Sequence, residues 1–503
     1  MKPKYALALS SIVLLTVGIS RMLYTWKTGF VLPDEGLYYQ SVLGNYALRP
    51  VFVFGLAILR RMFFVQTFFD FMRIAWIVGT VSSVGIILAF YLIMKKTGVK
   101  ESVQSYCILS ILFFPMFMLL SATWLTEAPA LFLDFLGLLP FLKYLKSHQL
   151  RFLILSCGIF LLSVLVRESG WIFLIGNTAF LAYLKIRKNP SASAVGLIIF
   201  AGVTLLSIPD LALVTLGLPY SFMPFNALTV PPQTNPIPIF SIPSERSSIQ
   251  PLTIIKDMTV GTAIAYGFPI LLVIISFLIE SLHFFWKDLD NMRTCLLFNS
   301  FFAFLMYLAF LIRLSTYQLV YMSTVIRFAY ASYPAILILP SVYEYLNSKW
   351  RKVAFALIPL TLTLVAFVGL PLLQSGVSAA NYNVYFNLNY ETPYLKAYNY
   401  FQSIPNQKVV VFAEPYPRVG LFLYNLVNIT FYGFYTNETV FDEIIHYDYW
   451  QGVYVYGEFY ANYYLSLQVN APFMLQLITQ NQSKYQIQTV WWDQESYLVE
   501  VKV

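Results

Sequence analysis

Long apolar runs recur along the first 373 residues, and they constrain the fold more than any other feature of this chain. A helix needs about 20 residues to cross the hydrocarbon core of a bilayer, and runs near that length follow one another here. Only 11% of the residues are charged, whereas a soluble domain carries about 25%. The sequence therefore predicts a polytopic α-helical membrane protein.

The apolar runs predict about eleven membrane helices. They lie at about 5–22, 74–94, 103–121, 127–145, 152–166, 171–186, 193–215, 259–281, 295–312, 328–346 and 353–373. Every second gap between them is short and basic, and five such gaps together with the amino-terminal segment hold sixteen of the 32 lysines and arginines. The positive-inside rule places these gaps in the cytoplasm. The protein is then expected in a plasma membrane, with a cytoplasmic amino terminus and an exterior first loop at 23–73.

The chain changes character after the last apolar run. Residues 1–373 are expected to form the membrane domain, and residues 374–503 a small exterior α/β domain that is rich in Tyr and Asn. Within it, Lys408–Phe412 and Thr489–Trp492 have the composition of strands. A helical stretch is expected near Phe473–Thr479.

Cysteines, histidines and net charge exclude several classes of function. Three cysteines lie in or beside apolar runs, so no disulfide framework is expected. Three histidines stand far apart, without a second ligand at the spacing of a metal site. The net charge of +8 is not gathered on one soluble face, so nucleic acid is not an expected partner.

Two adjacent carboxylates in the first exterior loop are the strongest candidates for chemistry. Asp34 and Glu35 lie between Pro33 and Gly36, which places them on a turn just beyond the first span. A carboxylate at the membrane surface can take a proton from an acceptor hydroxyl as that hydroxyl attacks a sugar carbon. The alternative is a pair of solvated loop acids, because adjacent acids are common.

Basic residues in the same loop run against the positive-inside trend. Arg49 and Arg60 are among them, and they suit a phosphate group. Attraction to anionic lipid headgroups is an equal alternative. The stretch from Pro50 to Met72 is amphipathic and is expected to lie along the membrane interface.

Other ionisable residues fall near the exterior ends of spans. Glu127 opens the fourth span, and Asp134 follows on the same helix face, about 10 Å deeper. A carboxylate at that depth should face the bundle interior or water. Arg167 and Glu168 form a tight turn, where a local ion pair between them is the alternative to a functional role. The remaining candidates are Arg313 and Arg327.

These acidic and basic residues, in this order along the chain, resemble the pattern of the type-C glycosyltransferases. It is most similar to the branch of protein O-mannosyltransferases and aminoarabinose lipid A transferases. The most specific parts are PDEG at 33–36 and RFAYASYP at 327–334. The chain lacks the inserted β-trefoil modules of eukaryotic protein mannosyltransferases. Trp491-Trp492-Asp493 also lacks the Tyr-Gly that completes the sequon-reading motif of oligosaccharyltransferases, which argues against transfer of a whole oligosaccharide to asparagine.

The resemblance implies a hexosyl- or pentosyltransferase that uses a dolichyl- or undecaprenyl-phosphate sugar. It would transfer the sugar with inversion, at the exterior face, to a hydroxyl of a protein, lipid or glycan. The implied catalytic residues are Asp34, Glu35 and Glu127; the donor-phosphate ligands are Arg49, Arg60, Arg167 and Arg327; the residues expected to line the cavity are Asp134, Glu168 and Arg313. No resident metal is assigned, and a Mg²⁺ or Mn²⁺ ion bridging Asp34 and Glu127 stays open.

Two other classes of function compete with this interpretation. A secondary transporter would use intramembrane acids to couple ions, but the sequence has no obvious internal repeat and no paired broken helices. A non-catalytic scaffold would use the tail to bind other surface proteins.

Overall fold

The computed structural model describes most of the chain. The described residues are 2–28, 38–39, 42, 49–65, 68–188, 191–206, 269–286, 290–316, 329–364, 391–404, 408–413, 429–433, 441, 450–458, 485–492 and 496–502. They fall into two compact units. The first comprises Met1–Ser20, Ala47–Leu56 and Ala75–Leu370; the second comprises Arg21–Tyr46, Ala57–Ile74 and Pro371–Val503.

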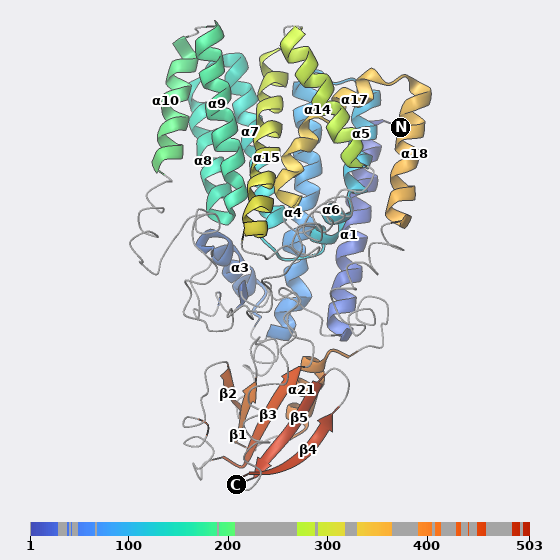
Figure 1. The fold of residues 1–503 in the computed structure, drawn as a ribbon, viewed down its shortest axis with the longest axis vertical. Helices are drawn as coiled ribbons and strands as arrows, with labels where there is room; N and C mark the ends of the chain where they lie inside the picture. Colours follow the sequence, from blue (N-terminus) through green and yellow to red (C-terminus); the bar gives the residue numbers. More distant parts are fainter. Residues whose placement is uncertain are drawn as a thin grey trace. The chain divides into compact units, whose positions relative to one another are not determined.

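Helices dominate the chain up to residue 364 (Figure 1). They are α1 (Pro3–Thr28), α3 (Pro50–Met62), α4 (Phe68–Lys96), α5 (Glu101–Leu112), α6 (Pro115–Ser121), α7 (Glu127–Ser147), α8 (Leu150–Val166), η1 (Glu168–Gly170), α9 (Trp171–Lys188), α10 (Ser191–Leu206), α14 (Pro269–Trp286), α15 (Asn291–Thr316), η4 (Ala329–Ile338), α17 (Pro340–Tyr345) and α18 (Ser348–Leu364). Every predicted apolar run overlaps one or two of them.

Four stretches among the described residues are long and apolar enough to cross a membrane. They are Pro3–Leu23, Asp70–Lys96, Glu127–Ser147 and Asn291–Ala309. Shorter apolar helices cover Leu150–Val166, Ala194–Thr204 and Ile270–Trp286. The chain is a membrane protein, as its composition indicates. The count of eleven crossings and their direction stay predictions.

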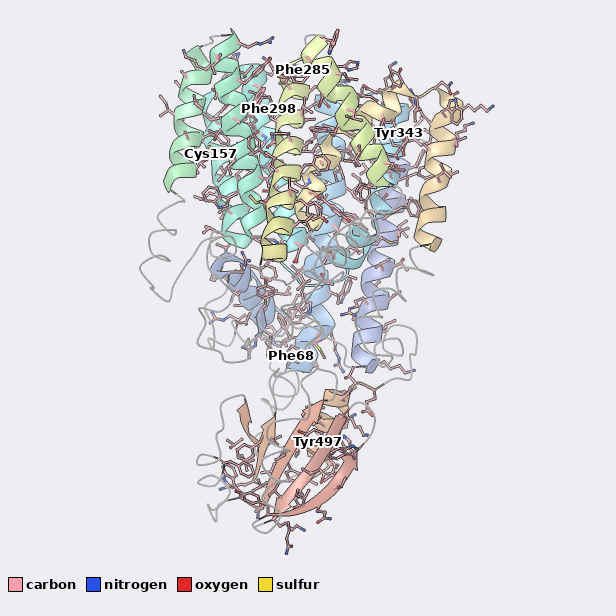
Figure 2. All side chains as sticks on the ribbon, in the orientation of Figure 1. Phe68, Cys157, Phe285, Phe298, Tyr343 and Tyr497 are labelled. Carbon is pink, nitrogen blue, oxygen red and sulfur yellow. The ribbon has the colours of Figure 1, made fainter. Side chains whose placement is uncertain are left out.

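Prolines divide two of the predicted runs. The run at 103–121 breaks after α5, because Pro115 has no N–H with which to continue the helical ladder. The run at 328–346 is a 3₁₀ helix with Pro334 inside it, followed by the short α17, which begins at Pro340. The hydroxyl groups of Ser110 and Tyr343 share a hydrogen bond of 2.6 Å, which joins α5 to α17 (Figure 2 labels Tyr343).

Close contacts fix the start of α7. A Cβ atom at Gly79 of α4 would lie 2.0 Å from the carbonyl oxygen of Thr123, so only glycine fits there. Beside it, the hydroxyl of Thr80 donates a 2.8 Å hydrogen bond to the carbonyl of Ser121. Helix α4 therefore packs directly on the turn that leads into Glu127.

Small and polar residues join α7, α8, α9 and α15, which lie side by side in Figure 1. Ser156 and Ser163 of α8 donate hydrogen bonds to backbone carbonyls of α7, at 2.8 and 3.0 Å. Asn299 of α15 donates a 2.9 Å hydrogen bond to Asn177 of α9. Such interhelical hydrogen bonds and small residues bring membrane helices together where no hydrophobic force acts between them.

The second unit contains a five-stranded sheet. Its strands are β1 (Val409–Ala413), β2 (Ile429–Gly433), β3 (Gly452–Glu458), β4 (Gln486–Trp492) and β5 (Ser496–Lys502), in the order β2-β1-β3-β5-β4. β1 is parallel to β2 and β3, and β5 is antiparallel to β3 and β4. The two predicted strands correspond to β1 and β4. The sequence reading missed the other three, and the helix expected near residue 475 lies outside the described residues.

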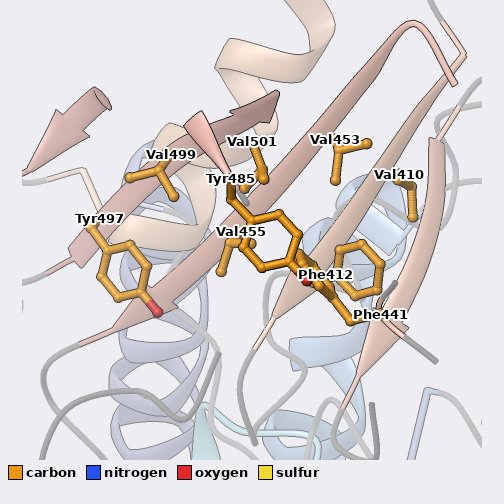
Figure 3. Packing of buried hydrophobic residues seen from close by; sticks show 9 residues of the cluster. All are labelled: Val410, Phe412, Phe441, Val453, Val455, Tyr485, Tyr497, Val499 and Val501. Atoms are coloured by element: carbon orange, nitrogen blue, oxygen red, sulfur yellow. The ribbon is translucent and has the colours of Figure 1, made fainter. Parts of the chain in front are cut away.

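One face of this sheet buries an apolar cluster (Figure 3). The cluster comprises Val410, Phe412, Phe441, Val453, Val455, Tyr485, Tyr497, Val499 and Val501. Alternate residues of β1, β3 and β5 supply most of it, because side chains along a strand point to opposite faces. Helix α21 (Pro393–Ser403) contacts β3 and β4 through Tyr400, whose ring lies 6.0 Å from that of Tyr454 and 5.8 Å from that of Trp491.

Candidate functional site

Half of the predicted site residues can be followed to side-chain level. Asp34, Glu35 and Arg327 lie outside the described residues. The backbones of Glu168 in η1 and Arg313 in α15 are described, but their side chains are not. Roles for these five residues stay predictions.

Glu127 and Arg167 form a buried ion pair between α7 and α8. The Arg167 Nη1 atom lies 2.9 Å from the Glu127 Oε1 atom and 2.8 Å from the hydroxyl of Thr126. The exposed fraction is 1% for Glu127 and 8% for Arg167. The partner that the structure gives to Arg167 therefore comes from the head of another helix.

Local chain geometry explains why these two side chains meet. Helix α8 ends at Val166, and Arg167 takes an extended conformation whose N–H still donates to the carbonyl of Ser163 at 2.8 Å. Glu127 is in the first turn of α7. An acid at a helix start and a base at a helix end both complement the helix dipoles. The pair thus stabilises the antiparallel contact of α7 with α8.

Asp134 lies two turns further along α7 and is also buried, with an exposed fraction of 1%. It faces the bundle interior, as its depth in the span predicts. Neither of its oxygens has a hydrogen-bond partner among the described residues. The nearby Ser163 hydroxyl donates its hydrogen bond to the carbonyl of Ala130 and not to this carboxyl group. Asp134 does not line the pocket of Arg60 and Arg61 that is described below.

Helix α3 ends in a turn that exposes an aromatic side chain. The N–H of Val65 donates to the carbonyl of Arg60 at 3.0 Å, and the N–H of Phe64 to that of Arg61 at 3.1 Å. This is the Schellman pattern, which usually has glycine at its left-handed position. Here Phe64 occupies it, with φ of 53° and an exposed fraction of 89%.

The same turn holds Arg60 in a defined orientation. Its Nε atom donates a 3.2 Å hydrogen bond to the carbonyl of Val65, and its guanidinium lies 5.8 Å from the ring centroid of Tyr39. The Tyr39 ring is held in turn by Phe68 and Phe71, at centroid distances of 4.8 and 5.0 Å. These contacts fix the orientation of the Arg60 guanidinium.

A pocket of about 500 Å³ opens beside this turn. It is lined by Val42, Ala57, Arg60, Arg61, Phe64 and Val65. Two guanidinium groups and an otherwise apolar wall suit an anion attached to an apolar body. The expected interfacial stretch is thus a real helix, but α3 stops at Met62, and the residues from Phe68 onward belong to α4.

Arg49 precedes α3 with φ of 47°, and its carbonyl accepts a hydrogen bond from the N–H of Val53 at 3.0 Å. It does not line the pocket of Arg60 and Arg61. Its predicted role at the donor phosphate stays a prediction.

Sequence reasoning missed a second ionic cluster, partly buried, which α14, α15 and α17 form together. Arg293 reaches Glu344 at 2.7 Å, Glu280 at 3.7 Å and Asp290 at 3.9 Å. The hydroxyl of Ser341 donates to Glu280 Oε1. One available signal was Glu280 itself, a lone acid within an apolar run. Arg293 lies in one of the short basic gaps, where the positive-inside rule already accounts for an arginine.

Comparison with solved structures identifies the fold. The crystal structure of the oligosaccharyltransferase of Archaeoglobus fulgidus in its apo form superposes with a TM-score of 0.51 and 14% identity, over 91% of this chain and 69% of that chain. Its complex with Zn and sulfate gives a TM-score of 0.51 and 12% identity, over 90% and 68% of the two chains. The archaeal oligosaccharyltransferase AglB of the same organism, in complex with an inhibitory peptide and a dolichol-phosphate, gives 0.50 and 12%, over 91% and 69%.

The chain has a type-C glycosyltransferase fold. The resemblance stated from PDEG and RFAYASYP is thereby confirmed at the level of fold. No protein-family model matches the sequence, and no curated protein does. At 12–14% identity the type-C fold is what the likeness establishes, so activity has to be argued from this chain's own residues.

Proposed function

We propose that the protein is a membrane glycosyltransferase that takes a sugar from a polyprenyl-phosphate carrier. The supporting observation is the pocket lined by Arg60 and Arg61 in a chain with the fold of a protein that was solved with a dolichol-phosphate. The proposed acceptor is a hydroxyl group of a protein, lipid or glycan on the exterior face of a plasma membrane.

The pocket suits the head of such a carrier. Guanidinium groups bind phosphate through two parallel N–H bonds, which fixes its orientation. Arg60 is already oriented by Val65 and Tyr39, so little side-chain freedom is lost on binding. The volume of about 500 Å³ exceeds what a phosphate alone needs and lies within the range of small-ligand sites.

The surroundings of the pocket suit the lipid tail. Helix α3 has 13 residues and is about 20 Å long, which is too short to cross a bilayer. Met62, Phe63 and Phe64 are exposed at its end. Exposed apolar residues beside arginines are typical of a helix that lies in the membrane interface. The lipid tail of a carrier can then stay in the membrane while its phosphate group enters the pocket.

The proposed reaction is an inverting displacement. The acceptor oxygen attacks the anomeric carbon, the bond from that carbon to the phosphate oxygen breaks, and the acceptor proton passes to the carboxylate of Asp34. Polyprenyl phosphate leaves with the electron pair, and this anion needs charge stabilisation from Arg60 and Arg61. Glu35 would assist the base.

Glu127 and Arg167 have a different role in this proposal. Because each neutralises the other inside the bundle, we assign them to ordering the adjoining ends of α7 and α8. The donor phosphate is assigned to Arg60 and Arg61, with Arg49 and Arg327 as further candidates. Asp134, Glu168 and Arg313 are proposed to line a cavity of the active site other than the pocket of Arg60 and Arg61.

A Mg²⁺ or Mn²⁺ ion bridging Asp34 and Glu127 stays open, because Asp34 lies outside the described residues. The Oε1 atom of Glu127 faces the guanidinium of Arg167. Among the described residues, no group of three His, Cys, Asp or Glu side chains could hold a metal ion. No step of the proposed reaction is routed through one.

Lipid binding by pocket variants tests the proposal. We expect Arg60→Ala or Arg61→Ala to weaken binding of a polyprenyl-phosphate sugar about ten- to hundredfold, since a hydrogen bond to a charged group contributes roughly 1.5–3 kcal/mol. Arg→Lys at either position should restore only part of the affinity, because lysine lacks the fork. Arg151→Ala, at an exposed arginine of α8, is the matched control.

Two further measurements separate the proposed enzyme from headgroup binding, from a transporter and from a scaffold. Equal losses for phosphatidylglycerol and for the polyprenyl-phosphate sugar would show that the arginines attract headgroups in general, and would sink the donor assignment. Transfer of radiolabelled sugar in membranes should disappear in Asp34→Asn at normal protein levels. Ion-dependent uptake into vesicles, with no sugar transfer, would favour the transporter, and neither activity would favour the scaffold.

A further inference from the structure

The turn that ends α3 places a large side chain where glycine is the usual residue. Phe64 has φ of 53°, inside the left-handed region. Glycine enters this region freely because it has no Cβ atom, and asparagine, aspartate and histidine are the next most common residues there. A bulky aromatic residue in this conformation is rare and strained. Phenylalanine at this position therefore needs a reason other than the turn itself.

Packing within the protein does not supply that reason. The exposed fraction of Phe64 is 89%, the highest of any large apolar side chain in the described residues. A side chain with so little contact adds little to the stability of the fold. The turn uses only the backbone N–H of Phe64, which donates to the carbonyl of Arg61, and glycine offers the same group.

Anchoring of α3 in the membrane interface does not supply the reason either. Met62 and Phe63 come just before Phe64, and 67% and 50% of their surfaces are exposed. Both provide apolar surface at the same helix end without a positive φ. Phe64 differs from them because it lines the pocket of Arg60 and Arg61, and they do not.

The turn also fixes Phe64 relative to the guanidinium of Arg60. The N–H of Val65 donates to the carbonyl of Arg60 at 3.0 Å, and the Nε atom of Arg60 donates to the carbonyl of Val65 at 3.2 Å. These two hydrogen bonds enclose Phe64, because a left-handed residue lets the chain turn back on the helix end. The other lining residues besides the two arginines are apolar: Val42, Ala57 and Val65. An aromatic ring thus stands beside the cationic groups on an apolar wall.

We propose that the Phe64 ring packs against the first isoprene units of the donor lipid, next to the phosphate that Arg60 and Arg61 hold. This inference rests on the proposed function and makes Phe64 a specificity residue for the lipid tail. Strained backbone conformations persist where function uses them. Here the strain lowers the stability of the free protein and provides an apolar contact that a phosphate without a tail cannot use.

Two phosphate monoesters that differ only in their tails test the proposal. Farnesyl phosphate carries a short isoprenoid tail, and methyl phosphate carries almost none. Binding to the purified full-length protein in detergent is measured with radiolabelled farnesyl phosphate, and methyl phosphate competes with it. We expect Phe64→Gly to weaken binding of farnesyl phosphate about tenfold, as loss of one large apolar contact predicts. Its affinity for methyl phosphate should equal that of the wild type.

Thermal melting of the same variant tests the strain. Phe64→Gly should melt at the wild-type temperature or about 1–2 °C above it, because glycine adopts the left-handed conformation without strain. Phe64→Leu keeps an apolar side chain, so it should retain most of the affinity for farnesyl phosphate and gain no stability. A large fall of the melting temperature in Phe64→Gly would show that the ring supports the fold and would overturn the proposal.

Matched variants separate the tail contact from other roles. Phe63→Ala removes an exposed ring that does not line the pocket, and it should bind both probes as the wild type does. An equal loss in Phe63→Ala would indicate general anchoring, and an equal loss for both probes in Phe64→Gly would place the ring at the headgroup; either overturns the proposal. Unchanged farnesyl phosphate binding in Phe64→Gly, with a loss in Arg60→Ala, would sink this inference alone. A wild type that binds neither probe would sink the proposed function as well.

Discussion

Two arginines of the helical unit, one buried and one partly exposed, show different ways of holding a charge inside a membrane protein. Among the described residues, Arg167 has one carboxylate partner at 2.9 Å, a hydroxyl at 2.8 Å and little solvent access. Arg293 faces three carboxylates at 2.7 to 3.9 Å, and its side chain is 27% exposed. The first arrangement is closed to solvent, whereas water reaches the second. A closed pair cannot lose one partner without leaving a buried charge, and an open cluster shares its charge with water.

The largest effect is expected from breaking the closed pair. Arg167→Ala leaves Glu127 buried without its counter-charge, which typically costs about 3–5 kcal/mol. Melting in detergent measures this loss. Replacing both residues, as Arg167→Met with Glu127→Gln, should recover much of it, because no lone charge remains. A double variant no more stable than Arg167→Ala would show that the pair does not act as a unit.

A smaller effect is expected at the second arginine. Arg293→Ala removes charge-assisted hydrogen bonds worth roughly 1.5–3 kcal/mol, but solvent reaches this cluster and softens the loss. The variant leaves the carboxylates of Glu280, Asp290 and Glu344 without Arg293, so salt should restore part of its stability by screening their repulsion. Melting in detergent at low and high NaCl measures this effect, and a loss as large as that of Arg167→Ala at both salt concentrations would contradict it.

Ser341→Ala should be milder again. It deletes one hydroxyl donor to the Glu280 carboxylate, whose remaining contact with Arg293 at 3.7 Å is kept, so we expect a loss near the lower end of the roughly 1.5–3 kcal/mol for a hydrogen bond to a charged group. The matched change Ser110→Ala removes the hydroxyl that bonds Tyr343 of the same helix and should cost about 1 kcal/mol, because neither partner is charged. Melting in detergent measures both, and a larger loss in Ser110→Ala than in Ser341→Ala would contradict this order.

The smallest effect at neutral pH is expected in the sheet, at Tyr454. Burial first, and then Tyr400 and Glu500, raise the pKa of the Tyr454 hydroxyl above its ordinary value. The folded state therefore keeps this proton when the unfolded chain has lost it. The resulting stability is complete below pH of about 10 and declines as pH rises beyond it, by on the order of 1 kcal/mol per pH unit.

Tyr454→Phe checks this sign. The variant should lose less stability than the wild type between neutral and strongly alkaline pH, as followed by melting with tyrosinate absorbance as a second signal. Tyr345→Phe, at an exposed tyrosine of α17, is the control and should follow the wild-type curve. Steeper alkaline loss in Tyr454→Phe would mean that the hydroxyl is better stabilised as the anion.

The sequence by itself determined the class of the protein and much of its secondary structure. Apolar runs of bilayer length in a chain with few charges have to lie in lipid. Such runs must be helical, because lipid offers the backbone no hydrogen-bond partners. PDEG and RFAYASYP were enough to indicate the type-C fold, which the comparisons confirm. The β-rich composition of β1 and β4 also marked them as strands, because it is a local property.

Tertiary structure decided which charges meet. The partners of Arg167 and Arg293 lie 40 and 51 positions away along the chain, and periodicity carries no information about contacts at that distance. Arg167 was expected to grip phosphate or to pair with its neighbour Glu168, yet its described partner is at the head of α7. The pocket of Arg60 also depends on Tyr39 and on a left-handed turn at Phe64. Packing decides such contacts, because an unpaired charge inside the protein costs too much free energy.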